Sequence, residues 1–299
     1  MIFTRRSLCC ALTAALALSH VARAAPQLDG MDTFETDRIT IDSTSGPGPD
    51  VILLPGLATP GEVWDGVVAD LDGRARTHVV NVKGFGHGDG AANAAGDLMA
   101  GVLSDIAVFT RDRGLDRPAL VGHSLGGTLA LQAGIETPDL YGRLMVVDAL
   151  PFVALLFDPG ATKDSVEEQA ASMRDRMAEA PAGANAEATA ERYAIGEDAQ
   201  KRVAEWIAAS DPQTVAQAFY EDMQTDLRPA LSDIVAPVHL IVPVPPEAEG
   251  RDFPAQYESL YGDVSNFTLH PVEEARHFVM LDQPDRMTAL IEDFLKLSD

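Results

Sequence analysis

Ser124 has the sequence context of a nucleophile. It is the centre of Gly122-His-Ser-Leu-Gly126, a G-x-S-x-G pattern that follows strand-like residues 117–121 and precedes the helix-like run 128–133. A sharp turn from strand to helix needs neighbours without bulk, which the two glycines provide. The turn lifts the serine hydroxyl above a sheet at a helix N-terminus, where unpaired N–H groups and the helix dipole favour developing negative charge. The pattern therefore predicts nucleophilic attack by Ser124.

His277 is the predicted base. A serine hydroxyl is a weak nucleophile until a base takes its proton, and histidine is the usual one. His277 follows the strand-like residues 265–272 and precedes the last predicted helix, so it lies in a loop at the same sheet edge as Ser124. The order serine, then histidine along the chain is typical of this strand–turn–helix arrangement.

The carboxylate that would orient His277 is open between two places. Asp148 ends the apolar strand 144–147, beside the predicted strand of Ser124, and a carboxylate buried there needs a partner. Glu247 and Asp252 instead lie in the proline-rich segment after the strand 238–242. We favour Asp148 because a side chain at the end of the neighbouring strand can reach the histidine.

The chain resembles the α/β-hydrolase superfamily. Three motifs carry the resemblance, which extends from about residue 33 to the C-terminus: Leu53-Leu-Pro-Gly-Leu57, Gly122-His-Ser-Leu-Gly-Gly127 and Arg276-His-Phe-Val-Met-Leu-Asp-Gln-Pro-Asp285. It implies an α/β fold with a mostly parallel sheet flanked by helices and an inserted helical cap. It also implies Ser-His-acid hydrolysis, commonly of esters, with the backbone N–H groups of Leu57 and Leu125 stabilising the oxyanion. The acid usually follows the penultimate strand, although some relatives place it where Asp148 stands.

Two residues depart from the superfamily's pattern. Pro55 stands where the first motif usually has histidine, although the N–H group of Leu57 is unaffected by that change. Arg276 stands where a glycine usually precedes the catalytic histidine, and we expect this cation to lower the basicity of the imidazole.

The segment order predicts one α/β core interrupted by a cap. We expect a signal peptide at 1–24, the first part of the core at 25–150, the helical cap at 151–229 and the second part of the core at 230–299. Within the core, strands are expected at 34–41, 51–54, 78–82, 119–121, 144–147, 238–242 and 266–269. The cap is rich in Ala, Glu and Met, and we expect some of its large apolar side chains to line a pocket over Ser124.

The N-terminus predicts export. Arg5 and Arg6 precede a short apolar run that ends in the cleavage-site pattern Ala22-Arg-Ala24, so we expect a mature chain that starts at Ala25 in the periplasm or outside the cell. No other run is long and apolar enough to serve as a membrane anchor.

Composition restricts the ligand classes. The chain has 46 acidic and 22 basic residues, a net charge of −24, which disfavours nucleic acid and anionic membranes as partners. Its two cysteines, Cys9 and Cys10, lie in the expected signal peptide, and the sequence has no HExxH motif. We therefore expect no metal and no cofactor in the mechanism.

These observations predict an exported serine hydrolase that cleaves a small or medium apolar ester through an acyl-enzyme. Two alternatives stay open. One is an aminopeptidase-type amide hydrolase, because the acidic surface would favour a substrate amine. The other is a non-catalytic binding protein on the same fold, because Pro55 and Arg276 depart from the superfamily's pattern and the carboxylate that would orient His277 is open.

Overall fold

The computed structural model describes residues 32–87, 90–248 and 252–297. The expected signal peptide and its cleavage site lie outside these residues. In the part of the chain that is described, no helix has the length and apolar character needed to cross a bilayer.

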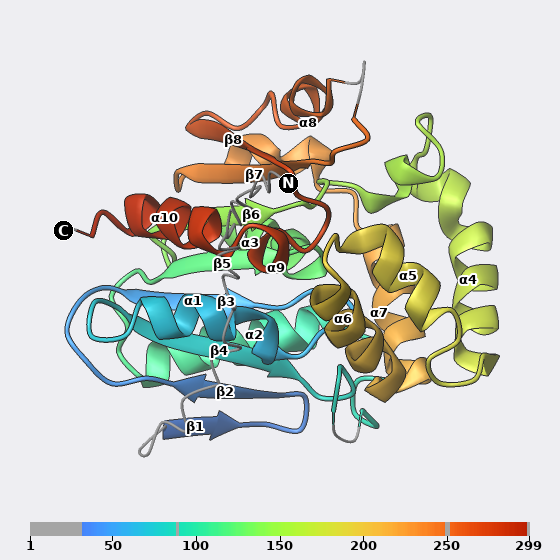
Figure 1. Ribbon diagram of the computed structural model, residues 1–299, viewed down its shortest axis with the longest axis horizontal. Coiled ribbons are helices and arrows are strands. Elements are labelled where there is room, and N and C mark those ends of the chain that lie inside the picture. Colours follow the sequence, from blue (N-terminus) through green and yellow to red (C-terminus); the bar gives the residue numbers. More distant parts are fainter. Residues whose placement is uncertain (1–31, 88–89, 249–251, 298–299) are drawn as a thin grey trace, which may run out of the picture.

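A mixed, mostly parallel sheet of eight strands forms the centre of the described fold (Figure 1). The spatial order is β1-β2-β4-β3-β5-β6-β7-β8. The strands are β1 (Asp32–Glu35), β2 (Ile39–Ser43), β3 (Asp50–Leu54), β4 (Arg76–Val82), β5 (Ala119–His123), β6 (Arg143–Val147), β7 (Val238–Val244) and β8 (Phe267–Glu273). The pairs β1–β2 and β2–β4 are antiparallel, and the others are parallel. This architecture confirms the predicted α/β fold.

One predicted strand is wrong. Residues 34–41 form the end of β1, a turn and the start of β2, and the two strands pair as a hairpin. The Thr36 hydroxyl accepts hydrogen bonds from the N–H groups of Arg38 and Ile39, both at 3.1 Å. This local side-chain bonding favours a turn over continued extension.

Helices cover both faces of the sheet. Alternate strand residues point to opposite faces, so Ile52 and Leu120 pack with α2 (Leu98–Asp112) and α3 (Leu125–Glu136). Val51 and Val121 pack on the other face with α1 (Asp65–Asp70) and α10 (Pro284–Leu295). The short helices η1 (Gly61–Trp64) and α9 (Val279–Asp282) lie on this second face, and α8 (Phe253–Leu260) lies between β7 and β8 in the chain. The central strands are therefore buried on both sides.

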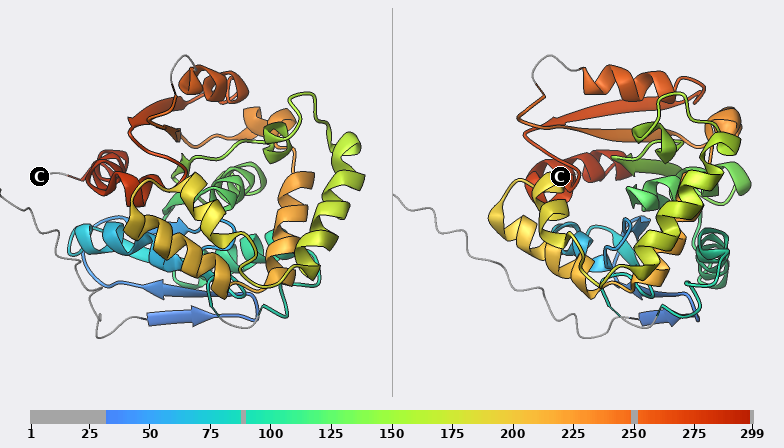
Figure 2. Two further views of the ribbon diagram at one scale, coloured as in Figure 1. Left: turned by 45° about the vertical axis from the view of Figure 1, so that its right-hand side comes forward. Right: turned by 90° about the vertical axis from the view of Figure 1, so that its right-hand side faces the viewer.

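The chain between β6 and β7 forms a helical layer at one end of the sheet (Figures 1 and 2). It contains η2 (Val153–Leu156), α4 (Lys163–Glu179), α5 (Ala186–Tyr193), α6 (Glu197–Ala209), α7 (Pro212–Gln224) and η3 (Arg228–Asp233). Thr162 begins α4 with a capping box, and Asp211 caps α7 just before Pro212. We call these elements the cap.

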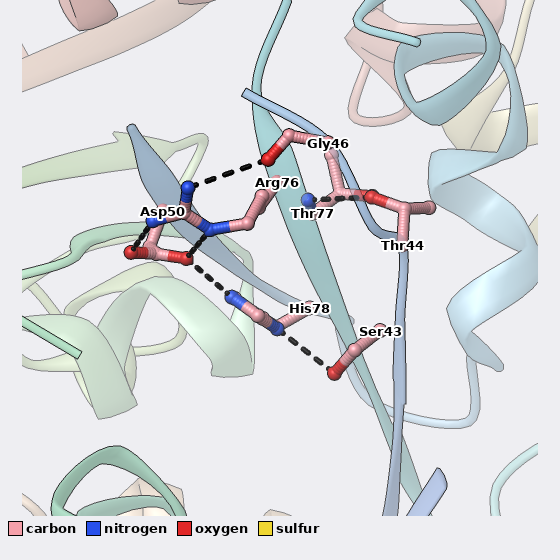
Figure 3. A network of polar contacts seen from close by, with 7 residues as sticks. All are labelled: Ser43, Thr44, Gly46, Asp50, Arg76, Thr77 and His78. Carbon is pink, nitrogen blue, oxygen red and sulfur yellow. Dashed lines mark hydrogen bonds and ion pairs between the residues drawn. The ribbon is translucent and has the colours of Figure 1, made fainter. Parts of the chain in front are cut away.

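A partly buried polar network holds the start of β3 against β4 (Figure 3). Asp50 accepts two hydrogen bonds from Arg76 and one from Nε2 of His78, whose Nδ1 accepts the Ser43 hydroxyl at 2.9 Å. Burial lowers the pKa of His78, so the ring is neutral at pH 7 and its contact with Asp50 is a hydrogen bond. Burial also opposes the charge on Asp50, but the bonds from Arg76 and His78 outweigh it and hold the pKa of that carboxyl below its ordinary value.

Candidate active site

Ser124 occupies a strained turn between β5 and α3. Its backbone has φ 53° and ψ −121°, a conformation that is costly for a residue with a side chain. A Cβ at Gly122 would lie 2.0 Å from the Gly126 carbonyl oxygen, and a Cβ at Gly126 would lie 2.5 Å from the Leu54 carbonyl oxygen. The close backbone packing therefore requires both glycines of the motif, and it holds Ser124 at the N-cap of α3.

Asp148 and His277 lie in direct contact. Asp148 follows β6 with φ 48°, and its N–H donates to the Ile241 carbonyl at 3.0 Å, which fixes the turn. His277 Nδ1 lies 2.6 Å from Asp148 Oδ2, and the two side chains are only 20% and 12% exposed. A carboxylate can only accept here, so Nδ1–H donates this hydrogen bond, and the neutral tautomer with that proton has its lone pair on Nε2.

Tyr257 on α8 is a site residue that the sequence analysis missed. Its hydroxyl donates to Asp148 Oδ1 at 2.5 Å, so the carboxylate is held through both oxygens. Burial and the neighbouring Asp148 charge raise the pKa of Tyr257 well above its ordinary value, which keeps the hydroxyl protonated as a donor. Asp252 followed by Pro254 is a helix-start signal that could have revealed α8, the helix that carries Tyr257.

The alternative acids have other partners. Glu247 pairs with Arg276, whose hydrogen bond holds the pKa of that carboxyl below its usual value. Asp252 caps α8 by accepting the Ala255 N–H at 3.0 Å. Of the three predicted candidates, Asp148 is the one that the structure places against His277.

Arg276 fastens the histidine loop to the cap. Its guanidinium donates to the carbonyls of Glu191 at 2.5 Å and Ala194 at 3.2 Å, in addition to pairing with Glu247. The Phe278 N–H also donates to the Tyr193 carbonyl at 3.1 Å. The residue that replaces the expected glycine thus connects the loop of His277 to the end of α5.

His123 supports the site from below. It is fully buried, and its Nε2 donates to the His277 carbonyl at 3.0 Å. Burial, then the neighbouring His277, lower the pKa of His123 well below its ordinary value, so the ring is neutral. A Cβ at Gly56 would lie 2.9 Å from His123 Nδ1 and 3.1 Å from Ser124 Cβ, which shows how closely the loop after β3 packs on the site.

A cavity of about 540 Å³ lies between the core and the cap, and both Ser124 and His277 line it. Five of the large apolar cap residues expected at a pocket line this cavity: Leu156, Phe157, Met173, Met177 and Phe219. Arg176 and Asp222 are charged residues in the cavity wall. Ser124 and His277 thus share a mainly apolar cavity.

The two predicted oxyanion donors border the same site. Leu57 follows β3 and lines the cavity, and Leu125 is the first residue of α3. Within the described chain, neither backbone N–H donates to a backbone or side-chain acceptor. Both donors are therefore free to bind a ligand oxygen.

The Ser43–His78–Asp50 network is separate from the site of Ser124. It lies at the opposite ends of the parallel strands from Ser124, and its Asp50 is held by Arg76. In the described part of the chain, its residues line none of the cavities that border the cap, and no group of three or more His, Cys, Asp or Glu side chains is placed to hold a metal ion.

A sequence profile of the alpha/beta hydrolase family matches residues 51–290. The chain belongs to this family. It is 32% identical over 206 residues to the pimeloyl-[acyl-carrier protein] methyl ester esterase of Nitrosomonas europaea, covering 66% of this chain and 77% of that one. It is 27% identical over 255 residues to the N-formylmaleamate deformylase of Pseudomonas putida, covering 84% and 90%.

Solved structures agree with the family assignment at the level of the fold. A thermophilic esterase from Thermogutta terrifontis, solved with malate bound, superposes with a TM-score of 0.74 at 18% identity, covering 89% of this chain and 98% of that one. The family assignment establishes the protein as a hydrolase.

Proposed function

We propose that this hydrolase cleaves carboxylic esters through a serine acyl-enzyme. The observation that carries the proposal is the contact of Asp148 with His277 at a cavity that His277 shares with Ser124. The relative from Nitrosomonas europaea supports ester cleavage, because it is a methyl ester esterase.

In the proposed acylation step, Ser124 Oγ attacks the ester carbonyl carbon and its proton passes to Nε2 of His277. The negative oxygen of the tetrahedral intermediate accepts hydrogen bonds from the N–H groups of Leu57 and Leu125. The carbon–oxygen bond to the alcohol then breaks, and the proton on Nε2 passes to the departing alkoxide.

In deacylation, a water molecule takes the place of the alcohol. Its proton passes to His277 Nε2 as its oxygen attacks the acyl carbon. The intermediate then breaks its bond to Ser124 Oγ, which recovers the proton, and the free acid leaves.

Three further residues prepare His277 for these transfers. Asp148 holds the Nδ1 proton and stabilises the imidazolium, while Tyr257 holds the second oxygen of Asp148. His123 anchors the backbone carbonyl of His277. This arrangement favours one ring orientation before the substrate binds, which reduces the reorganisation needed in the transition state.

The cavity favours a small or medium apolar acyl group. Apolar side chains form most of its wall, and burial of each methylene group contributes about 0.8 kcal/mol. A second candidate function is cleavage of an N-acyl bond, because one relative that matches most of the chain is named an N-formylmaleamate deformylase.

Steady-state hydrolysis of 4-nitrophenyl esters of two to eight carbons, with matched anilides, tests the proposal. We expect ester turnover, and we expect Ser124→Ala to remove nearly all of it, because the reacting groups act as a unit. Asp148→Asn should lower kcat by roughly 10³–10⁴-fold, whereas Glu247→Gln stays within about tenfold of the wild type. Retained turnover in Ser124→Ala would refute the mechanism, and the reverse order of the two acid variants would move the acid to Glu247.

A further inference from the structure

The cavity over Ser124 contains a carboxyl group that the hydrolytic mechanism does not use. Asp222 lies on α7, at the cap side of the cavity, and the residue is 8% exposed. Among the described residues that line this cavity, Asp222 is the only Asp or Glu. Polar groups in a mainly apolar pocket commonly fix the orientation of a ligand.

The hydrogen-bonding capacity of this carboxyl group is largely unused. An ionised carboxylate can accept about four hydrogen bonds through its two oxygens. Asp222 interacts with the Thr128 hydroxyl, but its Oδ1 has no partner among the described residues. A buried acceptor without a partner is unfavourable, so a ligand that donates to this carboxyl group relieves that cost.

No cation of the protein neutralises Asp222 in the described structure. Arg228 of the cap pairs with Asp226, and Arg176, the other charged residue of the cavity wall, donates to the Ser172 hydroxyl. Burial raises the pKa of Asp222 to about 7, and the bond from Thr128 only partly opposes this. A cation bound beside such a group favours its carboxylate form.

The position of Thr128 places this group close to the reacting centre. Thr128 lies one helical turn after Ser124 on α3, and its N–H donates to the Ser124 carbonyl at 3.1 Å. One turn rises about 5.4 Å along a helix. A substrate group that contacts Asp222 is thus separated from the attacked carbonyl by only a few bonds.

We propose that Asp222 determines specificity by binding a protonated amine that the substrate carries a few bonds from its ester carbonyl. The inference rests on the proposed ester hydrolysis and adds a substrate class to it. An ammonium group supplies both the missing donor and the missing cation, and its hydrogen bond to a carboxylate is stronger than that of a neutral hydroxyl. The net charge of −24 also concentrates cations around the protein.

Ligand binding measured without turnover tests the proposal. Dissociation constants from ligand-observed NMR are compared for n-alkylammonium ions of three to six carbons, primary alcohols of matched length and the matched carboxylates. We expect the wild type to bind the best ammonium ion at least tenfold more tightly than its alcohol. Asp222→Asn should remove this difference of about 1.4 kcal/mol, because the neutral amide cannot form the charge-assisted bond.

Asp175→Asn is the matched control. Asp175 is an exposed carboxylate of α4 in the same cap, bonded to Arg174, and its loss removes the same formal charge without touching the cavity. The control should retain the ammonium preference. Equal binding of ammonium ion and alcohol by the wild type, a preference that survives Asp222→Asn, or tighter binding of the carboxylates would each overturn the assignment.

Measuring ester turnover and ligand binding separately distinguishes this inference from the proposed function. Failure of Ser124 to react with esters would refute the mechanism, whereas the binding constants do not depend on turnover. Ester turnover without any ammonium preference would leave the mechanism intact and refute only the role of Asp222.

Discussion

Tyr257→Phe should slow the enzyme through Asp148 without removing a group that touches the substrate. The Tyr257 hydroxyl and His277 each bond one oxygen of the Asp148 carboxylate, at 2.5 and 2.6 Å. Hydrogen bonds to a charged group contribute about 1.5–3 kcal/mol, so loss of the whole bond in the transition state would lower kcat/KM at most about 150-fold. We expect about tenfold, because the bond to His277 remains.

The pH–rate profile distinguishes a positioning role from a structural one. Without the hydroxyl, the negative charge of Asp148 is less dispersed and attracts the imidazolium of His277 more strongly. We therefore expect the acidic limb of the kcat/KM profile to move to higher pH in Tyr257→Phe, with kcat lowered and KM little changed. A purely structural role would lower the urea midpoint and leave the acidic limb in place.

Tyr261→Phe is the control for this prediction. Tyr261 lies one turn later, and its hydroxyl donates to the Ala149 carbonyl at 2.8 Å. The substitution removes the same atom from a fully buried tyrosine and should lower stability by about 0.5–1.5 kcal/mol, with kcat/KM within about twofold of the wild type. The reasoning is wrong if Tyr257→Phe and Tyr261→Phe have the same kcat/KM and the same acidic limb.

Three further predictions concern other parts of the chain. Gly56→Ala should lower kcat/KM at least tenfold, measured on 4-nitrophenyl esters, because its Cβ would press on His123 and Ser124; activity within twofold of the wild type would contradict the packing described here. Burial raises the folded-state pKa of Asp222 to about 7, so the wild type loses stability as this carboxyl ionises between about pH 4 and 8. Asp222→Asn cannot ionise there and should become more stable relative to the wild type as the pH rises. Urea midpoints of the two proteins that fall in parallel would contradict this prediction. We also propose that the protein is exported and cleaved before Ala25, which N-terminal sequencing from a Gram-negative host would test; an intact Met1 in the soluble cell fraction would refute export.

Local sequence carried enough information to predict the centre of the site. The G-x-S-x-G turn depends on close contacts between residues four apart, and Asp148 stands out as an acid at the end of an apolar strand. The positions of Ser124, Asp148 and His277 then follow from the parallel strand order, because the carboxyl ends of such strands meet at one edge.

Contacts between distant segments account for what the sequence analysis missed. Tyr257 reaches Asp148 across 109 residues of chain, and no local pattern indicates that pairing. Arg276 was expected to act on the neighbouring imidazole, whereas its guanidinium bonds the carbonyls of Glu191 and Ala194 in the cap. The packing of the cap on the histidine loop determines both contacts, and the spacing of residues within either segment contains no information about it.

Mapping the covalent adduct of a fluorophosphonate probe tests the central claim most directly. The full chain is labelled, digested and analysed by mass spectrometry, alongside Ser124→Ala and the control Ser43→Ala, which removes the serine of the other histidine–aspartate network. The account predicts one adduct, on the peptide that contains Ser124, with no labelling of Ser124→Ala and full labelling of Ser43→Ala. An unlabelled wild type, or an adduct that persists in Ser124→Ala, would contradict it.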